Sequence, residues 1–316
     1  MKILSSGIIV ADILVKGYKK IPNPNELVYS EPLRLEIGGG ATNAAIALDS
    51  IGAETEIIGC IGDDVFGEGI LKLISQTSAR TTFLKRSKDF STATSIVLIP
   101  ETGERAFIHH PGANGHLTSK DLVEAIENLD GDLFNLSGFG VLPGIKIEEL
   151  KEVFLKAREK DMKVSFDVVT VEELAKHRKE FLNEILPLVD VFPPNFEEAK
   201  IITGMNDPVE IAKKLGEICG SFVAVTMGEN GAYISNGKNV VHLPPLKIET
   251  VDTTGAGDAF LAGLIYGALK GWDIEKTGKL ATLMGAFATT QMGASAAFRD
   301  KEKVKQFLKS NNFEID

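Results

Sequence analysis

The segment of this chain with the most chemical content reads Val251-Asp252-Thr253-Thr254-Gly255-Ala256-Gly257-Asp258-Ala259-Phe260. Three small residues stand just before an apolar, helix-like pattern that continues to Leu269. Small residues let the backbone approach a ligand closely, and a helix start carries unpaired N–H groups and the positive end of the helix dipole. The segment therefore predicts an anion site, most naturally for phosphate, formed by Gly255, Ala256 and Gly257.

Asp258 falls in the first turn of this predicted helix. A carboxylate in the positive field of a helix start stays ionised and can take a proton from a hydroxyl group that enters the site. The alternative is an aspartate that only stabilises the helix through its dipole. The chain contains no G-x-x-x-x-G-K-[ST] sequence, which removes the most frequent phosphate-binding loop as an explanation.

The composition is that of a globular protein with a net negative charge. The 316 residues include 44% hydrophobic and 25% charged side chains, and the formal net charge is −10. A chain without a basic cluster is a poor partner for nucleic acid or an anionic membrane, so we expect neither. The longest apolar run, 259–269, is too short to cross a bilayer, and the first residues lack the features of a signal peptide. These observations predict a cytoplasmic protein.

The cysteines and histidines do not form a metal pattern. Cys60 and Cys219 stand far apart in apolar surroundings and predict buried thiols in a reducing compartment. His109 and His110 are adjacent, with His116 close behind. Neighbouring side chains on a strand face opposite ways, so we expect one of the pair to point toward a ligand and the other toward solvent.

The N-terminal region offers a second candidate site. The apolar run from Ile3 to Val10 predicts a buried parallel strand that delivers Asp12 at its end, where open α/β sheets bind ligands. Asp12 is thus a candidate for binding hydroxyl groups, or alternatively a cap. Residues 38–45 read Gly-Gly-Gly-Ala-Thr-Asn-Ala-Ala at the start of a predicted helix. The glycines let backbone amides face a ligand, and a flexible hinge is compatible with the same pattern.

Three segments predict strands outside the main core. Residues 28–37 partly alternate apolar and polar side chains, and 92–99 and 105–110 flank the turn Pro100-Glu101-Thr102-Gly103. After Ile61, we expect Asp63 to cap a helix and Asp64 to complement its dipole.

From residue 120 onward, predicted helices and strands alternate, which indicates a parallel sheet with right-handed crossovers. Pro194-Asn195-Phe196-Glu197-Glu198 opens one of these helices. Asn195 and Glu198 share a helix face, which fits either a site for a hydrated Mg²⁺ or a capping box.

Residues 252–260 resemble the C-terminal signature of the PfkB, or ribokinase-like, family of carbohydrate kinases. Residues 38–45 resemble the N-terminal signature of that family, and Asn195-x-x-Glu198 resembles its Asn-x-x-Glu motif. The motifs occur in the family's order, and the resemblance covers essentially the whole chain. It implies a single ribokinase-like α/β domain over 1–316. Its three-layer α/β/α core would hold a mostly parallel sheet, with a small β-sheet lid formed by residues 13–37 and 92–110.

The resemblance implies that the protein is an ATP-dependent kinase that phosphorylates a hydroxyl of a sugar or sugar-like small molecule. ATP and Mg²⁺ would be its cofactors, with K⁺ as a further activator in some relatives. The implied site residues are Asp258, Gly255, Ala256 and Gly257 for catalysis; Asp12, Gly39, Gly40, Asn43 and Asp258 for the acceptor; and Asn195, Glu198, Thr226, Gly228 and Gly257 for the nucleotide. Glu198 would act on Mg²⁺ indirectly, Asp252 would serve a monovalent cation, and the lid would form a homodimer contact.

Two departures from the family pattern keep other functions open. Many relatives have Asp-x-Asn-x-Arg where this chain has Asp167-Val168-Val169-Thr170-Val171, and the ribokinase branch has an acidic contact where this chain has Ser137-Gly138-Phe139. Ribose is therefore not secured as the acceptor. One alternative is a nucleoside kinase in which Phe139 or the lid stacks on a base. Another is a non-catalytic nucleotide- or sugar-binding module, which would not need to retain Asp258. A dinucleotide-dependent oxidoreductase is disfavoured, because no proper fingerprint follows the first strand.

Overall fold

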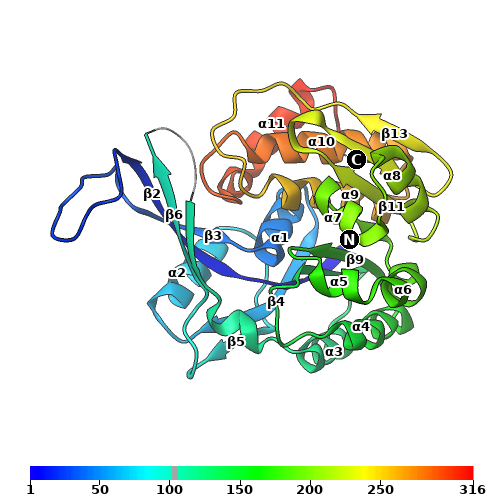
Figure 1. Cartoon of the computed structure of the whole chain (residues 1–316), viewed down its shortest axis with the longest axis horizontal. Coiled ribbons are helices and arrows are strands. Elements are labelled where there is room, and N and C mark those ends of the chain that lie inside the picture. Colours follow the sequence, from blue (N-terminus) through cyan, green and yellow to red (C-terminus); the bar gives the residue numbers. More distant parts are fainter. Residues whose placement is uncertain (102–105, 316) are drawn as a thin grey trace.

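The main sheet lies at the centre of the molecule. The computed structural model describes residues 1–101 and 106–315 (Figure 1). Within these residues the main sheet has the order β13-β12-β11-β10-β9-β8-β1-β4-β5. Its strands are β1 (Lys2–Gly7), β4 (Glu54–Gly62), β5 (Leu84–Ser87), β8 (Leu133–Phe139), β9 (Lys163–Val168), β10 (Val191–Phe192), β11 (Phe222–Thr226), β12 (Ala232–Ser235) and β13 (Val240–Leu243). In this spatial order, neighbouring strands are parallel from β11 across to β5, and β12 and β13 form an antiparallel edge.

Helices cover both faces of this sheet, which confirms the predicted three-layer core (Figure 1). One apolar cluster involves α1 (Gly40–Ser50), α2 (Val65–Ile74), α9 (Ala256–Lys270), α10 (Ile274–Ala288) and α11 (Lys301–Ser310). The other face carries α3 (Ser119–Asn128), α4 (Ile147–Glu159), α5 (Glu172–Lys176), α7 (Phe196–Thr203) and α8 (Pro208–Gly216), with the short α6 (Arg178–Glu180) beside them. Parallel strands connected by helices bury both sheet faces, so the strands are apolar almost throughout.

A second sheet projects to one side of this core (Figure 1). Its order is β3-β2-β6-β7, with β2 (Val10–Tyr18), β3 (Arg34–Gly38), β6 (Thr94–Pro100) and β7 (Ala106–His110). The β2–β6 pair is parallel and the other two pairs are antiparallel. Leu14, Val97 and Ile99 form a small apolar cluster of their own, against which Met292 packs from the core. We call this sheet the lid.

The prediction that one strand runs from Ile3 to Val10 is wrong. Strand β1 ends at Gly7, and the chain then turns into lid strand β2, so Asp12 lies inside the lid instead of at the end of a core strand. The turn requires glycine: Gly7 has φ +131°, and a Cβ there would lie 1.8 Å from the carbonyl oxygen of Ser137.

The lid strands also differ in extent from the sequence prediction. The structure has no strand over 28–33, because pairing with β2 begins only at Arg34. The predicted turn residues Thr102 and Gly103, and the predicted strand start at Arg105, lie outside the described residues.

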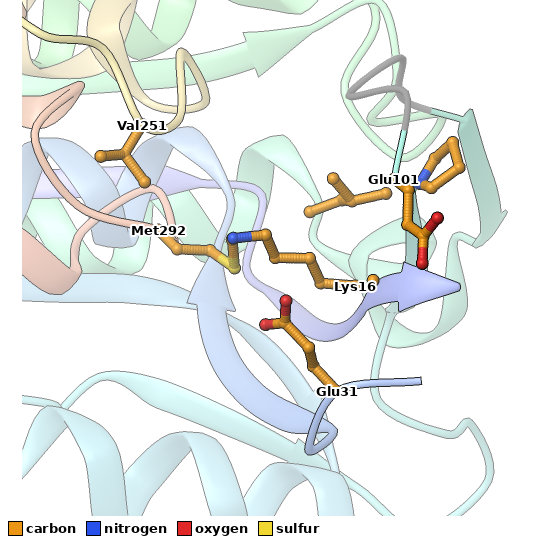
Figure 2. Close-up of a pocket in the computed structure, with 8 residues that line it drawn as sticks. Lys16, Glu31, Glu101, Val251 and Met292 are labelled. Carbon is orange, nitrogen blue, oxygen red and sulfur yellow. The ribbon is translucent and has the colours of Figure 1, made fainter. Parts of the chain in front are cut away.

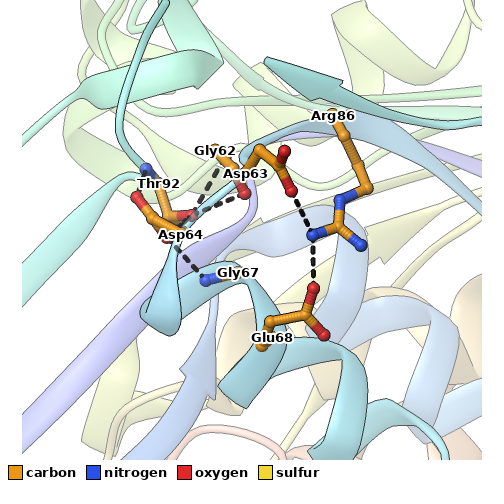
Figure 3. A network of polar contacts seen from close by, with 7 residues as sticks. All are labelled: Gly62, Asp63, Asp64, Gly67, Glu68, Arg86 and Thr92. Atoms are coloured by element: carbon orange, nitrogen blue, oxygen red, sulfur yellow. Dashed lines mark hydrogen bonds and ion pairs between the residues drawn. The ribbon is translucent and has the colours of Figure 1, made fainter. Parts of the chain in front are cut away.

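The prediction that Asp63 caps the helix is wrong, because Asp64 takes the cap (Figure 3). Asp64 is the N-cap of α2, and its side chain accepts a hydrogen bond of 2.8 Å from the Gly67 amide. Asp63 instead forms an ion pair with Arg86, which also pairs with Glu68. The residue directly before the first helical turn is the one whose side chain can reach the free amides, which is why Asp64 takes the cap.

Candidate active site

One hydrogen bond joins the two glycine-rich signatures. The Asn43 side-chain amide donates to Oδ2 of Asp258 over 2.8 Å, although the two residues are 215 positions apart. Asn43 lies in the first turn of α1 and Asp258 in the first turn of α9, and both helices pack into the same apolar cluster. The packing of these two helices thus brings both predicted binding loops to one place.

Glycines allow this close approach. Gly39 has φ +94°, and a Cβ on it would lie 2.3 Å from the carbonyl oxygen of Ile8. A Cβ on Gly40 would lie 3.2 Å from Oδ1 of Asp258, and one on Gly38 would lie 2.1 Å from Oδ2 of Asp12. The N-terminal signature therefore leaves room for the carboxyl groups of Asp12 and Asp258 at its surface.

The start of α9 has the features of an anion site. Gly255 is its N-cap with φ +78°, and no side chain caps the helix. A Cβ at Gly255 would lie 2.3 Å from the carbonyl oxygen of Ala294, whereas one at Gly257 would meet nothing within 4 Å. The first turn therefore borders open space and has no side-chain oxygen to satisfy its amides, so an anion fits there.

The surroundings of Asp258 raise its pKa. Burial of the carboxyl group has the largest effect, and the hydrogen bond from Asn43 opposes it. The helix dipole alone, from which an ionised Asp258 is predicted, would lower this pKa. A raised pKa makes the carboxylate a stronger proton acceptor.

A third carboxyl group, that of Asp167, belongs to the same electrostatic system. Burial raises its pKa well above the ordinary value, and the charges of Asp258 and Glu198 add to this effect. Backbone hydrogen bonds from Val168 and Gly138 act in the opposite direction. In the sequence, Asp167 is only the first residue of an incomplete Asp-x-Asn-x-Arg motif. Its position near the carboxyl end of β9 was the signal that could have identified it.

The residues predicted to bind nucleotide lie further along the same sheet edge. Asn195 follows strand β10 and pairs in an isolated parallel bridge with Thr226, the last residue of β11. Strand β11 is three positions from β8 in the sheet, which corresponds to about 14 Å at ordinary strand spacing. Gly228, with φ +57°, begins the short helix η4 (Gly228–Asn230) directly behind Thr226.

Asn195 and Glu198 form the capping box that the sequence analysis left as one alternative. The Asn195 side chain accepts from the Glu198 amide over 2.9 Å, and the Glu198 carboxylate accepts from the Asn195 amide over 2.8 Å. Burial raises the pKa of Glu198, while the bonds to Asn195 lower it. One carboxylate oxygen thus serves the helix, and the second carboxylate oxygen is available for a hydrated cation.

Asp252, which was predicted to serve a monovalent cation, connects two loops. Its carboxylate accepts from the Thr254 amide over 2.7 Å and from the Gly293 amide over 2.9 Å, and the residue is 2% exposed. This fixes the loop that follows α10 against the turn that precedes α9.

Asp12 contributes from the lid. Burial raises its pKa from 3.8 to about 7; a hydrogen bond from the Ser95 hydroxyl lowers it, and the charges of Asp252 and Glu36 raise it further. Asp12 is thus half-buried between the lid and the core, in an acidic environment.

The remaining candidates are the histidines, predicted near a ligand, and Phe139, suggested to stack on a base. His109 contacts Ser95 in the lid, whereas His116 stacks on Phe90. Among the described residues, no three His, Cys, Asp or Glu side chains are grouped to hold a metal ion. Phe139 is 2% exposed and packs 5.5 Å from Phe166, so the suggestion that it stacks on a base is wrong.

Both cysteines are buried free thiols, as predicted. Burial raises the pKa of Cys219 to about 12, which leaves this thiol unreactive at neutral pH.

A cavity of about 330 Å³ lies where the lid meets the C-terminal loops (Figure 2). Lys16, Glu31 and Glu101 line it from the lid side, and Val251 and Met292 line it from the core. None of the predicted site residues lines this cavity, although Val251 and Met292 each adjoin a residue of the Asp252–Gly293 contact.

The comparisons with known proteins identify relatives along nearly the whole chain. Residues 2–301 match the family described as pfkB family carbohydrate kinase. The chain is 31% identical over 252 residues to an uncharacterized sugar kinase of Archaeoglobus fulgidus, covering 79% of this chain and 96% of that protein. It is 26% identical over 285 residues to the aminoimidazole riboside kinase of Salmonella typhimurium, covering 87% and 88%.

The fold is shared with solved structures. The structure of Arabidopsis thaliana ribokinase complexed with ribose and ATP matches with a TM-score of 0.78 at 21% identity, covering 98% of each chain. Within residues 1–101 and 106–315, no helix is long and apolar enough to span a membrane.

We expect Asp12→Asn to raise the melting temperature at pH 8. The pKa of Asp12 in the folded protein, about 7, lies above the ordinary 3.8, so the folded state binds this proton more tightly. The free energy of unfolding therefore falls as the pH rises through this interval, and asparagine removes that loss. Calorimetry should show a gain at pH 8 that shrinks toward pH 4.

Asp64→Asn is the matched control, because hydrogen bonds from Gly67 and Thr92 overcome burial and lower the pKa of Asp64. This variant should melt at a lower temperature at pH 8. An Asp12→Asn protein that melts no higher than wild type at pH 8 would contradict the prediction.

Proposed function

The chain belongs to the pfkB family of carbohydrate kinases, and from that membership we propose how its residues phosphorylate a hydroxyl group with ATP. The protein is a sugar or nucleoside kinase of the ribokinase-like type. The observation that carries the assignment of roles is the hydrogen bond between Asn43 and Asp258, which unites the two signatures at the open start of α9.

Asp258 is proposed as the base. Its raised pKa and its placement beside Gly40 suit it to orient an acceptor hydroxyl and take its proton. The amides of Gly255, Ala256, Gly257 and Asp258 are proposed as the anion hole for the transferred phosphoryl group. Phosphoryl transfer has a loose transition state, so positioning and charge stabilisation should contribute more than basicity.

Asp12, Gly39, Gly40 and Asn43 are proposed to bind the acceptor. An ionised Asp12 can accept hydrogen bonds from two hydroxyl groups of a sugar. The glycines place no side chain between the acceptor and the backbone, and Gly38 leaves space for the Asp12 carboxylate.

The nucleotide is proposed to lie along the sheet edge toward Asn195, Thr226 and Gly228. Mg²⁺ supplies counter-charge to the triphosphate when it is bound. Glu198 and Asp167, whose charges act on each other, are proposed to hold its water ligands, since hydrated Mg²⁺ requires few direct carboxylates. Asp252, at the junction of the two loops, is proposed to support a K⁺ site together with nearby carbonyl groups.

A nucleoside remains the alternative acceptor, because a relative is named as a riboside kinase. A non-catalytic binding module is the alternative of a different class. The acceptor can be identified by measuring ATP consumption with Mg²⁺ against sugars, polyols and nucleosides, with and without K⁺. A substrate-dependent rate supports the kinase, and ATP binding without any turnover supports the binding module.

Asp258→Asn should lower kcat by about 10²–10⁴-fold, the usual contribution of a general base. Nucleotide binding should persist, because the amide keeps the shape of the carboxylate and the backbone of α9 is unchanged. Steady-state kinetics and nucleotide titration measure the two effects. Asp273→Asn, which alters the N-cap of α10, is the control, and unchanged turnover in Asp258→Asn would refute the assignment of the base.

Glu198→Gln should raise the Mg²⁺ concentration needed for half-maximal activity by about tenfold, as for residues that act through a metal's water ligands. The melting temperature should change little, because the glutamine oxygen can still accept from the Asn195 amide. Asp121→Asn, in the equivalent capping box of α3, should leave the Mg²⁺ requirement unaltered. If Glu198→Gln and wild type need the same Mg²⁺ concentration for half-maximal activity, the role of Glu198 is limited to the helix cap.

We also propose a homodimer through the outer face of the lid. Ile13, Ile96 and Ile108 pair across β2, β6 and β7 on the face opposite to Asp12, and Ile108 is 60% exposed. Exposed apolar surface of this kind marks an interface. Ile108→Lys should therefore convert a dimer into monomers in sedimentation experiments, whereas Val209→Lys should not. A wild-type protein that sediments as a monomer at micromolar concentration would exclude this dimer.

A further inference from the structure

A single row of polar side chains crosses the lid. Asp12 on β2 stands opposite Glu36 on β3 and opposite Ser95 on β6, and Ser95 stands opposite His109 on β7. Residues directly opposite on neighbouring strands point to the same face of a sheet. All four side chains therefore share the face that carries Asp12.

Glu36, at one end of the row, is bound to the core by Arg299. This residue lies in the short helix η5 (Ala296–Arg299) and forms an ion pair with Glu36, with side-chain exposures of only 17% and 13%. The Glu36 side chain also passes close to Gly293, where a Cβ would lie 3.1 Å from its Cγ. Glu36 thus fills the contact between lid strand β3 and the loop that holds Asp252.

The other end of the row is His109. Its Nδ1 lies 3.0 Å from the Ser95 hydroxyl oxygen, and Ser95 stands opposite Asp12 and lowers the pKa of its carboxyl group. In the arrangement in which the single Ser95 hydroxyl proton is directed to Asp12, Nδ1 of His109 carries the proton shared with Ser95. Burial, followed by the neighbouring charge of His110, lowers the pKa of His109, which favours the neutral ring.

The charged and polar groups around Asp12 influence whether its carboxyl group is ionised. Glu36 and Asp252 both disfavour an ionised Asp12, and Ser95 favours it. Arg299 offsets the charge of Glu36, and the Asp252 charge is held by two backbone amides. Lys16 points from the same face of β2 into the cavity beside Met292 (Figure 2). Arg299 contacts Glu36 and His109 contacts Ser95, so either residue can be substituted without removing a direct neighbour of Asp12.

We propose that Arg299 and His109 are positioning residues, which act through Glu36 and Ser95 to aim the Asp12 carboxylate at the acceptor. Asp12 then binds the acceptor in the correct orientation only while the ion pair of Arg299 with Glu36 keeps β3 against the C-terminal segment. This proposal rests on the proposed role of Asp12 in acceptor binding and adds two residues that the family motifs do not contain.

The decisive experiment compares Arg299→Met, Glu36→Gln and the double variant. The acceptor is the compound that gives the fastest ATP consumption in the panel described above, and kcat/KM is followed from pH 5.5 to 9. Arg299→Met should raise the acceptor KM about tenfold, with the KM for ATP unchanged, because only a charge beside Asp12 is lost. The acidic limb of its profile should move to higher pH.

Glu36→Gln should move the same limb to lower pH, and the double variant should return it toward the wild-type position, because the uncompensated charge is gone. A merely structural contact would not give shifts of opposite sign that cancel. Arg86→Met is the control: it removes an arginine that pairs with the carboxylates of Asp63 and Glu68 (Figure 3) and with none of the row, and should change neither KM nor profile.

At the other end, His109→Asn retains a donor near the Nδ1 position and should preserve the acceptor KM, whereas His109→Leu should raise it several-fold. If Arg299→Met does not fold, Arg299→Gln, which keeps hydrogen-bond donors but removes the charge, gives the same comparison with Glu36→Gln.

Asp12→Asn separates failure of this proposal from failure of the proposed function. An Asp12→Asn enzyme with a normal acceptor KM overturns the acceptor site itself. A raised KM in Asp12→Asn, combined with unshifted profiles in Arg299→Met and Glu36→Gln, overturns only the row.

Discussion

The hydrogen bond between Asn43 and Asp258 is the contact on which the rest of the site depends. It connects the first turns of α1 and α9, and Gly40 leaves space beside it, because a Cβ there would lie 2.8 Å from Cβ of Ser137 and 3.2 Å from Oδ1 of Asp258. A side chain at Gly40 would therefore press on Ser137 and on the Asp258 carboxyl group. Gly40 is thus required by residues distant in the chain, whereas Gly39 is required by its positive φ and by the carbonyl oxygen of Ile8.

The candidate site is assembled between two sheets. The core contributes Asp258 and the open start of α9, while the lid contributes Asp12 from β2. Several contacts determine their relative position: Ala11 and Ile37 of the lid belong to the main apolar cluster, Met292 packs on the apolar cluster of the lid, and Arg299 pairs with Glu36. These contacts hold Asp12, the proposed acceptor residue, in place relative to Asp258, the proposed base.

Several carboxyl groups share an environment that disfavours their charge. Burial raises the pKa values of Asp12, Asp167, Glu198 and Asp258, and like charges add to the effect at Asp12 and Asp167. Such carboxyl groups are poor neighbours for a triphosphate unless a cation accompanies it. A bound Mg²⁺ would stabilise the ionised form of the same groups. The negative charge of the site and its proposed metal dependence therefore have one physical origin.

The sequence by itself determined the layered α/β core, the antiparallel edge and the two glycine-rich helix starts, because these follow from local periodicity and residue size. It did not determine the path of the chain after Gly7, which transfers Asp12 from the core to the lid, since that turn depends on the neighbouring carbonyl of Ser137. Nor did it predict the association of Asp167 with Asp258, or the row from Arg299 to His109. These arrangements depend on strand register and helix packing, which bring together residues that are distant in the chain, so only the tertiary structure decided them.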